Sequence, residues 1–90
     1  MDTTDALLLE ILHGDGESAQ TPVLFAPCNV RVRVPAERLF IERRFGAEGT
    51  DWTEEMHYTS MAGHSVWNLR MADGTTRSVY FDTENTTYDG

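Results

Sequence analysis

The sequence predicts an α+β fold, with an N-terminal helix and a second short helix packed on an antiparallel sheet of four to five strands. Three observations lead to this prediction: a capped apolar segment near the start, alternation of valine and arginine around residue 32, and a series of alternating segments separated by turns in the second half. A chain of 90 residues has room for one domain with a modest core. We expect its polar tail to fray from about residue 83.

The opening segment predicts a helix over about residues 5–13. Thr3 or Thr4 can cap its start, and Gly14 follows the last apolar residue as a stop signal. The leucine and isoleucine side chains between them form a broad apolar stripe. We expect the rest of the domain to cover this stripe.

The next signal is a regular alternation. Val30, Val32 and Val34 alternate with Arg31 and Arg33, which is typical of a half-buried strand. Such a strand would present the two guanidinium groups side by side on its exposed face, where like charges favour an anionic partner.

The segment over residues 35–45 is ambiguous. Pro35 at a first-turn position, Arg43 and Arg44 in the last turn and Gly46 beyond the end indicate a helix. The apolar positions also fit a strand, which would instead give an all-β barrel with a helical cap. We favour the helix.

From Trp52 onwards the pattern predicts an antiparallel meander. Met56 and Tyr58 alternate against Glu55 and His57 in the first strand. Further strands are expected over about residues 65–71 and 76–82.

The last two strands are joined at Asp73 and Gly74. A strict two-residue turn would place a serine opposite the core residue Leu69, so burial favours a register slipped by one residue through a three-residue loop or a bulge. We predict that Trp67 pairs with Phe81 and Leu69 with Val79.

No residue pattern indicates a catalytic or metal site. The acidic glycine turns lack the alternating oxygen ligands of a calcium loop, and the three histidines are scattered over different elements. Cys28 has no companion thiol and no neighbour that would activate it. We therefore expect no metal, no cofactor and no enzymatic activity. The absence of a long apolar run and of a basic leader predicts a cytoplasmic protein without a membrane anchor.

Charge is distributed in blocks. Residues 1–30 carry five acids and no base, residues 31–44 carry five arginines and two glutamates, and residues 45–90 carry eight acids and two arginines, for a formal charge of −8. Arginine suits fixed, bidentate recognition of carboxylate or phosphate. The candidate residues for binding a partner or an anion are Arg31, Arg33, Arg43, Arg44, Arg70 and Trp52.

These observations predict a small acidic, non-catalytic module that binds another protein as an inhibitor, adaptor or regulatory subunit. Its charge suits a basic or nucleic-acid-handling partner, whereas a pI near 4.6 disfavours direct binding to nucleic acid. The alternatives are a small-ligand or anion site at Arg31, Arg33 and Arg70, and a homodimer formed through an edge strand or the helix stripe. In outline the small acidic chain resembles phage inhibitor proteins that imitate the charge of DNA, and the arginine-rich segment departs from that pattern.

Overall fold

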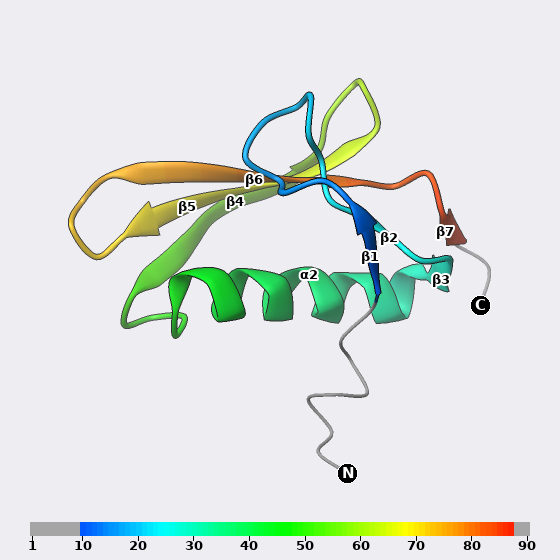
Figure 1. The fold of residues 1–90 in the computed structure, drawn as a ribbon. Coiled ribbons are helices and arrows are strands. Elements are labelled where there is room, and N and C mark those ends of the chain that lie inside the picture. Colours follow the sequence, from blue (N-terminus) through cyan, green and yellow to red (C-terminus); the bar gives the residue numbers. More distant parts are fainter. Residues whose placement is uncertain (1–9, 88–90) are drawn as a thin grey trace, which may run out of the picture.

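A computed structural model describes residues 10–87 and shows one helix packed against one face of a twisted sheet (Figure 1). The main sheet is antiparallel with strand order β4-β5-β6, and two small two-stranded sheets join β1 to β2 and β3 to β7. The elements are β1 (Ile11–His13), β2 (Leu24–Phe25), β3 (Cys28–Asn29), α2 (Val30–Phe45), β4 (Trp52–Thr59), β5 (His64–Met71), β6 (Thr76–Asp82) and β7 (Thr86–Thr87). The α+β class is confirmed, with three strands in the main sheet.

The predicted N-terminal helix is wrong where it can be compared with the structure. Ile11–His13 forms β1, which pairs antiparallel with β2. Its residues are exposed, so the apolar stripe that suggested a helix is not covered there by the core. The rest of that prediction falls on residues outside the described part of the chain.

The alternating valines and arginines lie in helix α2, so the predicted strand over residues 30–34 is wrong. Asn29 caps the helix, because its side-chain oxygen accepts a hydrogen bond of 2.8 Å from the Arg31 N–H. Pro35 lies inside the helix and not in its first turn. The helix continues to Phe45, which confirms the helical reading of residues 35–45 and removes the barrel alternative.

The face of α2 that meets the sheet does have helical spacing, although half of it is charged. The buried side chains are Arg33, Ala36, Glu37 and Ile41, at intervals of three, one and four residues. An apolar pattern could not reveal this face because two of its members are an arginine and a glutamate.

The three strands of the meander are confirmed. The hairpin between β5 and β6 has a loop of three residues, since Met71 N donates to Thr75 O at 2.8 Å and Gly74 N donates to Met71 O at 2.9 Å. Trp67 pairs with Val79, and Leu69 pairs with Arg77. The predicted loop length is therefore right. The predicted pairs are wrong by two positions along β6, because the three loop residues are Ala72, Asp73 and Gly74.

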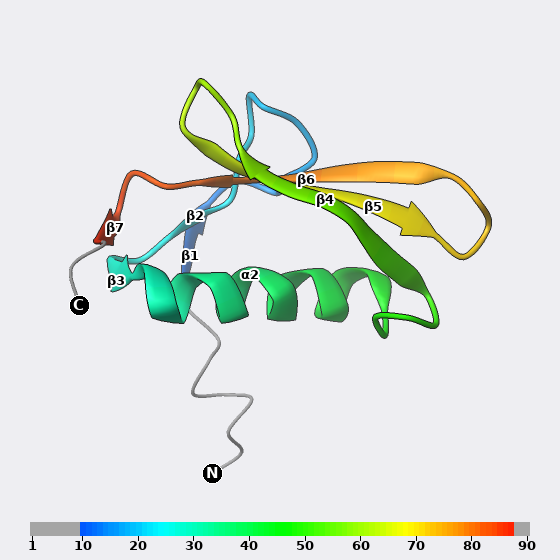
Figure 2. The same cartoon turned by 180° about the vertical axis from the view of Figure 1, so that it is seen from behind.

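The core lies between α2 and the meander, and it extends to the β2 segment. Its buried members are Val23, Phe25, Ala36, Ile41, Trp52, Trp67, Leu69, Val79 and Phe81. The hairpin of β5 and β6 continues past the C-terminal end of α2, as both side views show (Figures 1 and 2). The part of the sheet beyond the helix therefore lacks a helical cover.

Residues 83–87 are tied to the start of α2, in contrast to the fraying expected from about residue 83. β7 pairs parallel with β3, and Cys28 N donates to Asn85 O at 3.1 Å. Arg33 Nη1 also donates to Thr86 Oγ1 at 3.1 Å. The end of the described chain thus closes the N-terminal end of the helix.

Candidate functional site

The arginine-rich segment is engaged by acids of the chain itself. The fold brings glutamates from the N-terminal loop, from the helix and from β4 against three of its arginines. Arg38 contacts Glu48 and Glu54, and its hydrogen bond with Glu48 raises the pKa of Arg38 above the ordinary value. The other pairs are Arg33 with Glu37 at 2.9 Å and Arg44 with Glu17 at 2.7 Å.

The predicted anion site does not assemble. Arg31 is exposed on the first turn of α2, whereas Arg33 is buried in the same helix. Arg70 lies on β5 and donates to Glu55 through Nε at 2.9 Å and Nη2 at 2.6 Å. Arg43 is exposed in the last helical turn. The structure therefore does not place Arg31, Arg33 and Arg70 on one face of the sheet.

Trp52 is also not available as a partner contact. It is 1% exposed, and its indole Nε1 donates to Gly46 O at 2.9 Å. The start of β4 turns the ring of this predicted binding residue inward, into the core.

Glu37 is the centre of a buried polar network between α2 and β5. Trp67 Nε1 and the Ser65 hydroxyl donate to Glu37 Oε1 at 2.7 and 2.9 Å, and Arg33 Nε lies 2.9 Å from Oε2. His57 Nε2 lies 2.8 Å from Ser65 Oγ and 3.5 Å from Glu37 Oε1. Serine, histidine and carboxylate are therefore neighbours, but the serine is 1% exposed and donates to the carboxylate. This network fixes the helix on the sheet and cannot present Ser65 to a substrate.

Glu55 and His57 lie on opposite faces of β4, in contrast to the alternation expected from the sequence. A register shift in β4 between Glu54 and Met56 places Glu55 beside Arg70 on the outer face, while the His57 ring stacks on Trp67 on the helix side, with ring centroids 4.1 Å apart. Glu55 and His57 therefore do not share a face, because the extra residue at the shift reverses the alternation.

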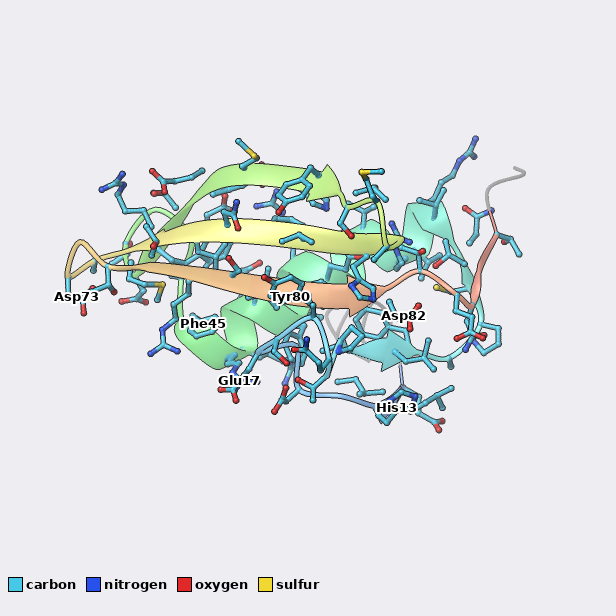
Figure 3. All side chains as sticks on the ribbon, turned by 90° about the horizontal axis from the view of Figure 1, so that it is seen from above. His13, Glu17, Phe45, Asp73, Tyr80 and Asp82 are labelled. Carbon is cyan, nitrogen blue, oxygen red and sulfur yellow. The ribbon has the colours of Figure 1, made fainter. Side chains whose placement is uncertain are left out.

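The outer face of the main sheet, opposite α2, has an apolar row. Tyr58 pairs with Val66, and Val66 pairs with Tyr80, so the row crosses all three strands. Val66 is 1% exposed between these neighbours, whereas Tyr58 is 43% exposed and the nearby Met56 is 55% exposed. Figure 3 looks onto this face, with Tyr80 along β6 and the helix behind the sheet.

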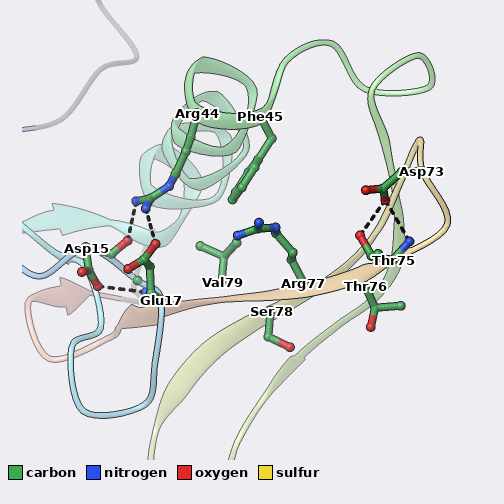
Figure 4. A pocket seen from close by; sticks show the side chains of 11 residues that line it. Asp15, Glu17, Arg44, Phe45, Asp73, Thr75, Thr76, Arg77, Ser78 and Val79 are labelled. Carbon is green, nitrogen blue, oxygen red and sulfur yellow. Dashed lines mark hydrogen bonds and ion pairs between the residues drawn. The ribbon is translucent and has the colours of Figure 1, made fainter.

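A cleft of about 460 Å³ lies between the C-terminal end of α2, β6 and the loop that follows β1 (Figure 4). Residues from three separate parts of the chain line it: Asp15, Gly16, Glu17, Arg44, Phe45, Asp73, Thr75, Thr76, Arg77, Ser78 and Val79. The loop can approach β6 because Gly16 has a φ of 75° and a Cβ there would lie 3.0 Å from the Val23 side chain and 3.1 Å from Tyr80 O. This contact forms one wall of the cleft.

Two guanidinium groups lie over the Phe45 ring in this cleft. The Cζ atoms of Arg44 and Arg77 are each 5.7 Å from the ring centroid, within the range of cation–π attraction. Arg44 is neutralised by Glu17, whereas no carboxylate of residues 10–87 forms an ion pair with Arg77. Arg77 is therefore the cationic group of the cleft that forms no ion pair within the described chain, although its charge contributes to lowering the pKa of Asp73.

Two aspartates lie at opposite sides of the cleft (Figure 4). The Glu17 N–H and the Thr21 hydroxyl donate to Asp15 and lower the pKa of its carboxyl. The hydroxyl and the N–H of Thr75 donate to Asp73 and lower its pKa in the same way. Both carboxylates are thus held in the charged form.

Within residues 10–87 no group of three or more His, Cys, Asp or Glu side chains is placed to hold a metal ion. Burial raises the pKa of the Cys28 thiol, with the Arg33 charge acting in the opposite direction. A thiol in this setting is a weak nucleophile at neutral pH. No helix in the described range is long and apolar enough to cross a membrane.

Comparison with protein-family models, with curated proteins and with solved structures found no match.

The sequence carried a usable signal for Arg77, which was not among the predicted site residues. In the alternation of β6, Arg77 shares a face with Val79 and Phe81, and it is therefore an arginine at a core-facing position. No comparable signal pointed to Phe45 or to the loop at Gly16, because their meeting with β6 depends on the path of the whole chain.

Proposed function

We propose that the protein is a small non-catalytic module that binds another protein through the outer face of its β4-β5-β6 sheet. The observation that carries this proposal is the apolar row of Tyr58, Val66 and Tyr80, with Met56 beside it, on a face that the helix does not cover. Tyrosine and methionine are enriched where protein interfaces form. Met61, in the turn after β4, is fully exposed.

The surroundings of the row favour a protein surface as its partner. Ser78 Oγ donates to Asn68 Oδ1 at 2.8 Å, and the Glu55 and Arg70 charges neutralise each other. These polar groups lie in the neighbouring rows of the same face and resemble the polar rim that surrounds the apolar centre of an interface. β4 is also an edge strand of its sheet, and an edge strand can extend a contact through its backbone groups.

The formal charge of −8 favours a partner with a basic surface, including an enzyme that handles nucleic acid, because long-range attraction accelerates association. In this proposal the negative charge selects a basic partner and accelerates its association, and burial of the apolar row supplies most of the affinity. We propose that the protein acts as an inhibitor, adaptor or regulatory subunit, and each of these roles would use this contact surface. The anion-binding alternative loses support, since Arg33 and Arg70 are engaged by Glu37 and Glu55.

The test uses a double variant, Met56→Gln with Tyr58→Thr, which removes the exposed apolar groups without changing charge. Val32→Gln is the matched control, because Val32 is an exposed apolar residue on the helix, 37% exposed, away from the sheet face. Immobilised wild-type protein and Val32→Gln should recover the same stoichiometric partner from native lysate at low and moderate salt. The purified partner should bind the double variant at least about tenfold more weakly, equivalent to about 1.4 kcal/mol.

Equal binding by the wild type and the double variant would place the contact elsewhere. Circular dichroism and thermal unfolding of each variant establish that the fold is intact. Light scattering over a concentration series identifies the case in which the occupant is a second copy, and a dimer lost in the double variant would replace the proposed heterologous partner.

A further inference from the structure

The outer edge of β6 is covered along only part of its length. Tyr80 N donates to Gly16 O at 2.9 Å, Val23 N donates to Tyr80 O at 2.9 Å, and Asp82 N donates to Val23 O at 2.8 Å. The segment between β1 and β2 thus acts as a neighbouring strand for the C-terminal half of β6. It does not continue alongside the N-terminal half.

The exposed half of this edge presents backbone groups for pairing. Along one edge of a strand the groups directed outwards belong to alternate residues, so the N–H and C=O of Ser78 and Thr76 point to the same side as those of Tyr80 and Asp82. The backbone groups of the odd-numbered residues of this segment point instead towards β5. Met71 N, for example, donates to Thr75 O across the β5–β6 hairpin. Within residues 10–87 no backbone hydrogen bond engages the outward groups of Thr76 and Ser78. An extended chain could therefore pair there.

Arg77 lies between these two residues and points to the helix side, into the cleft at the end of α2 (Figure 4). Side chains of paired residues on adjacent strands lie on the same face of a sheet. A residue that paired with Arg77 would therefore place its own side chain in the cleft, beside the guanidinium group and the Phe45 ring. The volume of about 460 Å³ is within the usual range for a binding pocket and leaves room for such a side chain.

We propose that an extended peptide segment of a partner protein adds to the sheet along residues 76–78 of β6 and inserts a carboxylate side chain against Arg77. The carboxylate supplies the ion-pair partner that Arg77 lacks within the described chain, in a bidentate geometry for which guanidinium is suited. Asp15 and Asp73, at the two sides of the cleft, select basic residues two positions before and two positions after that acid, because alternate side chains of an extended segment lie on the same face. The inference rests on the proposal that the protein binds other proteins, and it adds a second contact surface to the sheet face.

The test screens the full chain against a phage-displayed library of random short peptides. The enriched sequences should share an acidic residue with lysine or arginine two positions before or after it, and a synthetic representative should bind in a titration followed by NMR. The amide signals of Thr76, Arg77 and Ser78 should shift, and hydrogen exchange at the Thr76 and Ser78 amides should slow, because these N–H groups become hydrogen bonded.

Matched variants separate the backbone contact from the charge contact. Thr76→Pro removes an outward N–H that an edge strand can lose without unfolding, whereas Thr76→Val keeps it. Thr76→Pro and Arg77→Gln should each weaken the peptide at least about tenfold, and Thr76→Val should not. Arg77→Glu should lose the original peptide and gain binding to one in which the central acid is replaced by arginine.

Three outcomes would overturn the inference: enrichment of no peptide, enrichment of peptides without a central acid, or binding that survives both Thr76→Pro and Arg77→Gln. The pair Met56→Gln and Tyr58→Thr should leave peptide binding unchanged, so failure at the cleft is distinct from failure of the proposed sheet-face contact. A peptide that responds to the sheet-face variant instead would assign it to the outer face and reject the cleft.

Discussion

The indole nitrogen of Trp67 donates a hydrogen bond of 2.7 Å to Oε1 of Glu37, and this bond joins strand β5 to helix α2 inside the core. Glu37 has no exposed surface, and the same carboxylate also engages Ser65 and Arg33. A buried charge is tolerated only where such partners replace water. The helix is thus fixed in one position relative to the sheet by a charged group and by apolar contact together.

Glu37→Gln should destabilise the protein strongly, because it leaves the Arg33 guanidinium buried without its anionic partner. The expected loss in the free energy of unfolding is about 3–5 kcal/mol, the usual result of breaking a buried ion pair from one side. Chemical denaturation followed by tryptophan fluorescence measures it. Glu42→Gln, on the exposed side of the same helix, should change the free energy by less than about 0.5 kcal/mol. Similar losses for the two variants would contradict the structural role of the network.

Gly46→Ala should destabilise the end of α2 more than Gly49→Ala does. Gly46 has φ 107° and ψ −159°, a conformation that is largely restricted to glycine and that costs another residue about 1–3 kcal/mol. A Cβ at this position would also overlap Asp51 Oδ2, which accepts a hydrogen bond of 2.7 Å from Ala47 N. Gly49 has φ 89°, but a Cβ there would meet no atom within 4 Å. Thermal unfolding should therefore rank wild type, Gly49→Ala and Gly46→Ala in decreasing stability, and a reversed order of the two variants would refute the crowding at Asp51.

Stability should decrease as the pH falls below the ordinary aspartate pKa of 3.8, with Asp73 as one contributor. Its folded-state pKa is lowered by the Thr75 hydroxyl and N–H, so its contribution is complete above the unfolded pKa and is lost as the pH falls through the lower folded value. Asp73→Asn and Thr75→Val should both reduce this acid dependence when unfolding is measured across that pH range. Thr53→Val, on an exposed position of β4, is the control and should leave the dependence unchanged.

The sequence predicted the three strands of the meander and the turn at Asp73 and Gly74, but it predicted neither the register shift in β4 nor the residue pairs between β5 and β6. It predicted helix α2 only in part, since the first turns of that helix read as a strand. The positions that α2 buries include Arg33 and Glu37, and a search for apolar residues at helical spacing does not detect charged ones. Arg33 and Glu37 are four residues apart, which is the spacing of an ion pair along a helix, and this spacing is consistent with the observed helix.

The candidate site was less predictable than the fold. Arg33, Arg38 and Arg44 form internal ion pairs with Glu37, with Glu48 and Glu54, and with Glu17. Most of these glutamates are distant in sequence, so only the folded chain could show which charges remain available. Arg77 lies outside the arginine-rich segment in the sequence, and the fold brings it over the Phe45 ring in the cleft.

The pairing of β3 with β7 has a consequence for the order in which the protein folds. The hydrogen bond from Arg33 to Thr86 spans 53 residues, whereas the meander pairs neighbouring strands through short turns. Contacts that close long loops form late, after the local ones have restricted the chain. During synthesis the contacts of β3 and Arg33 with residues 86 and 87 can therefore form only after those residues leave the ribosome, well after the helix itself has been made.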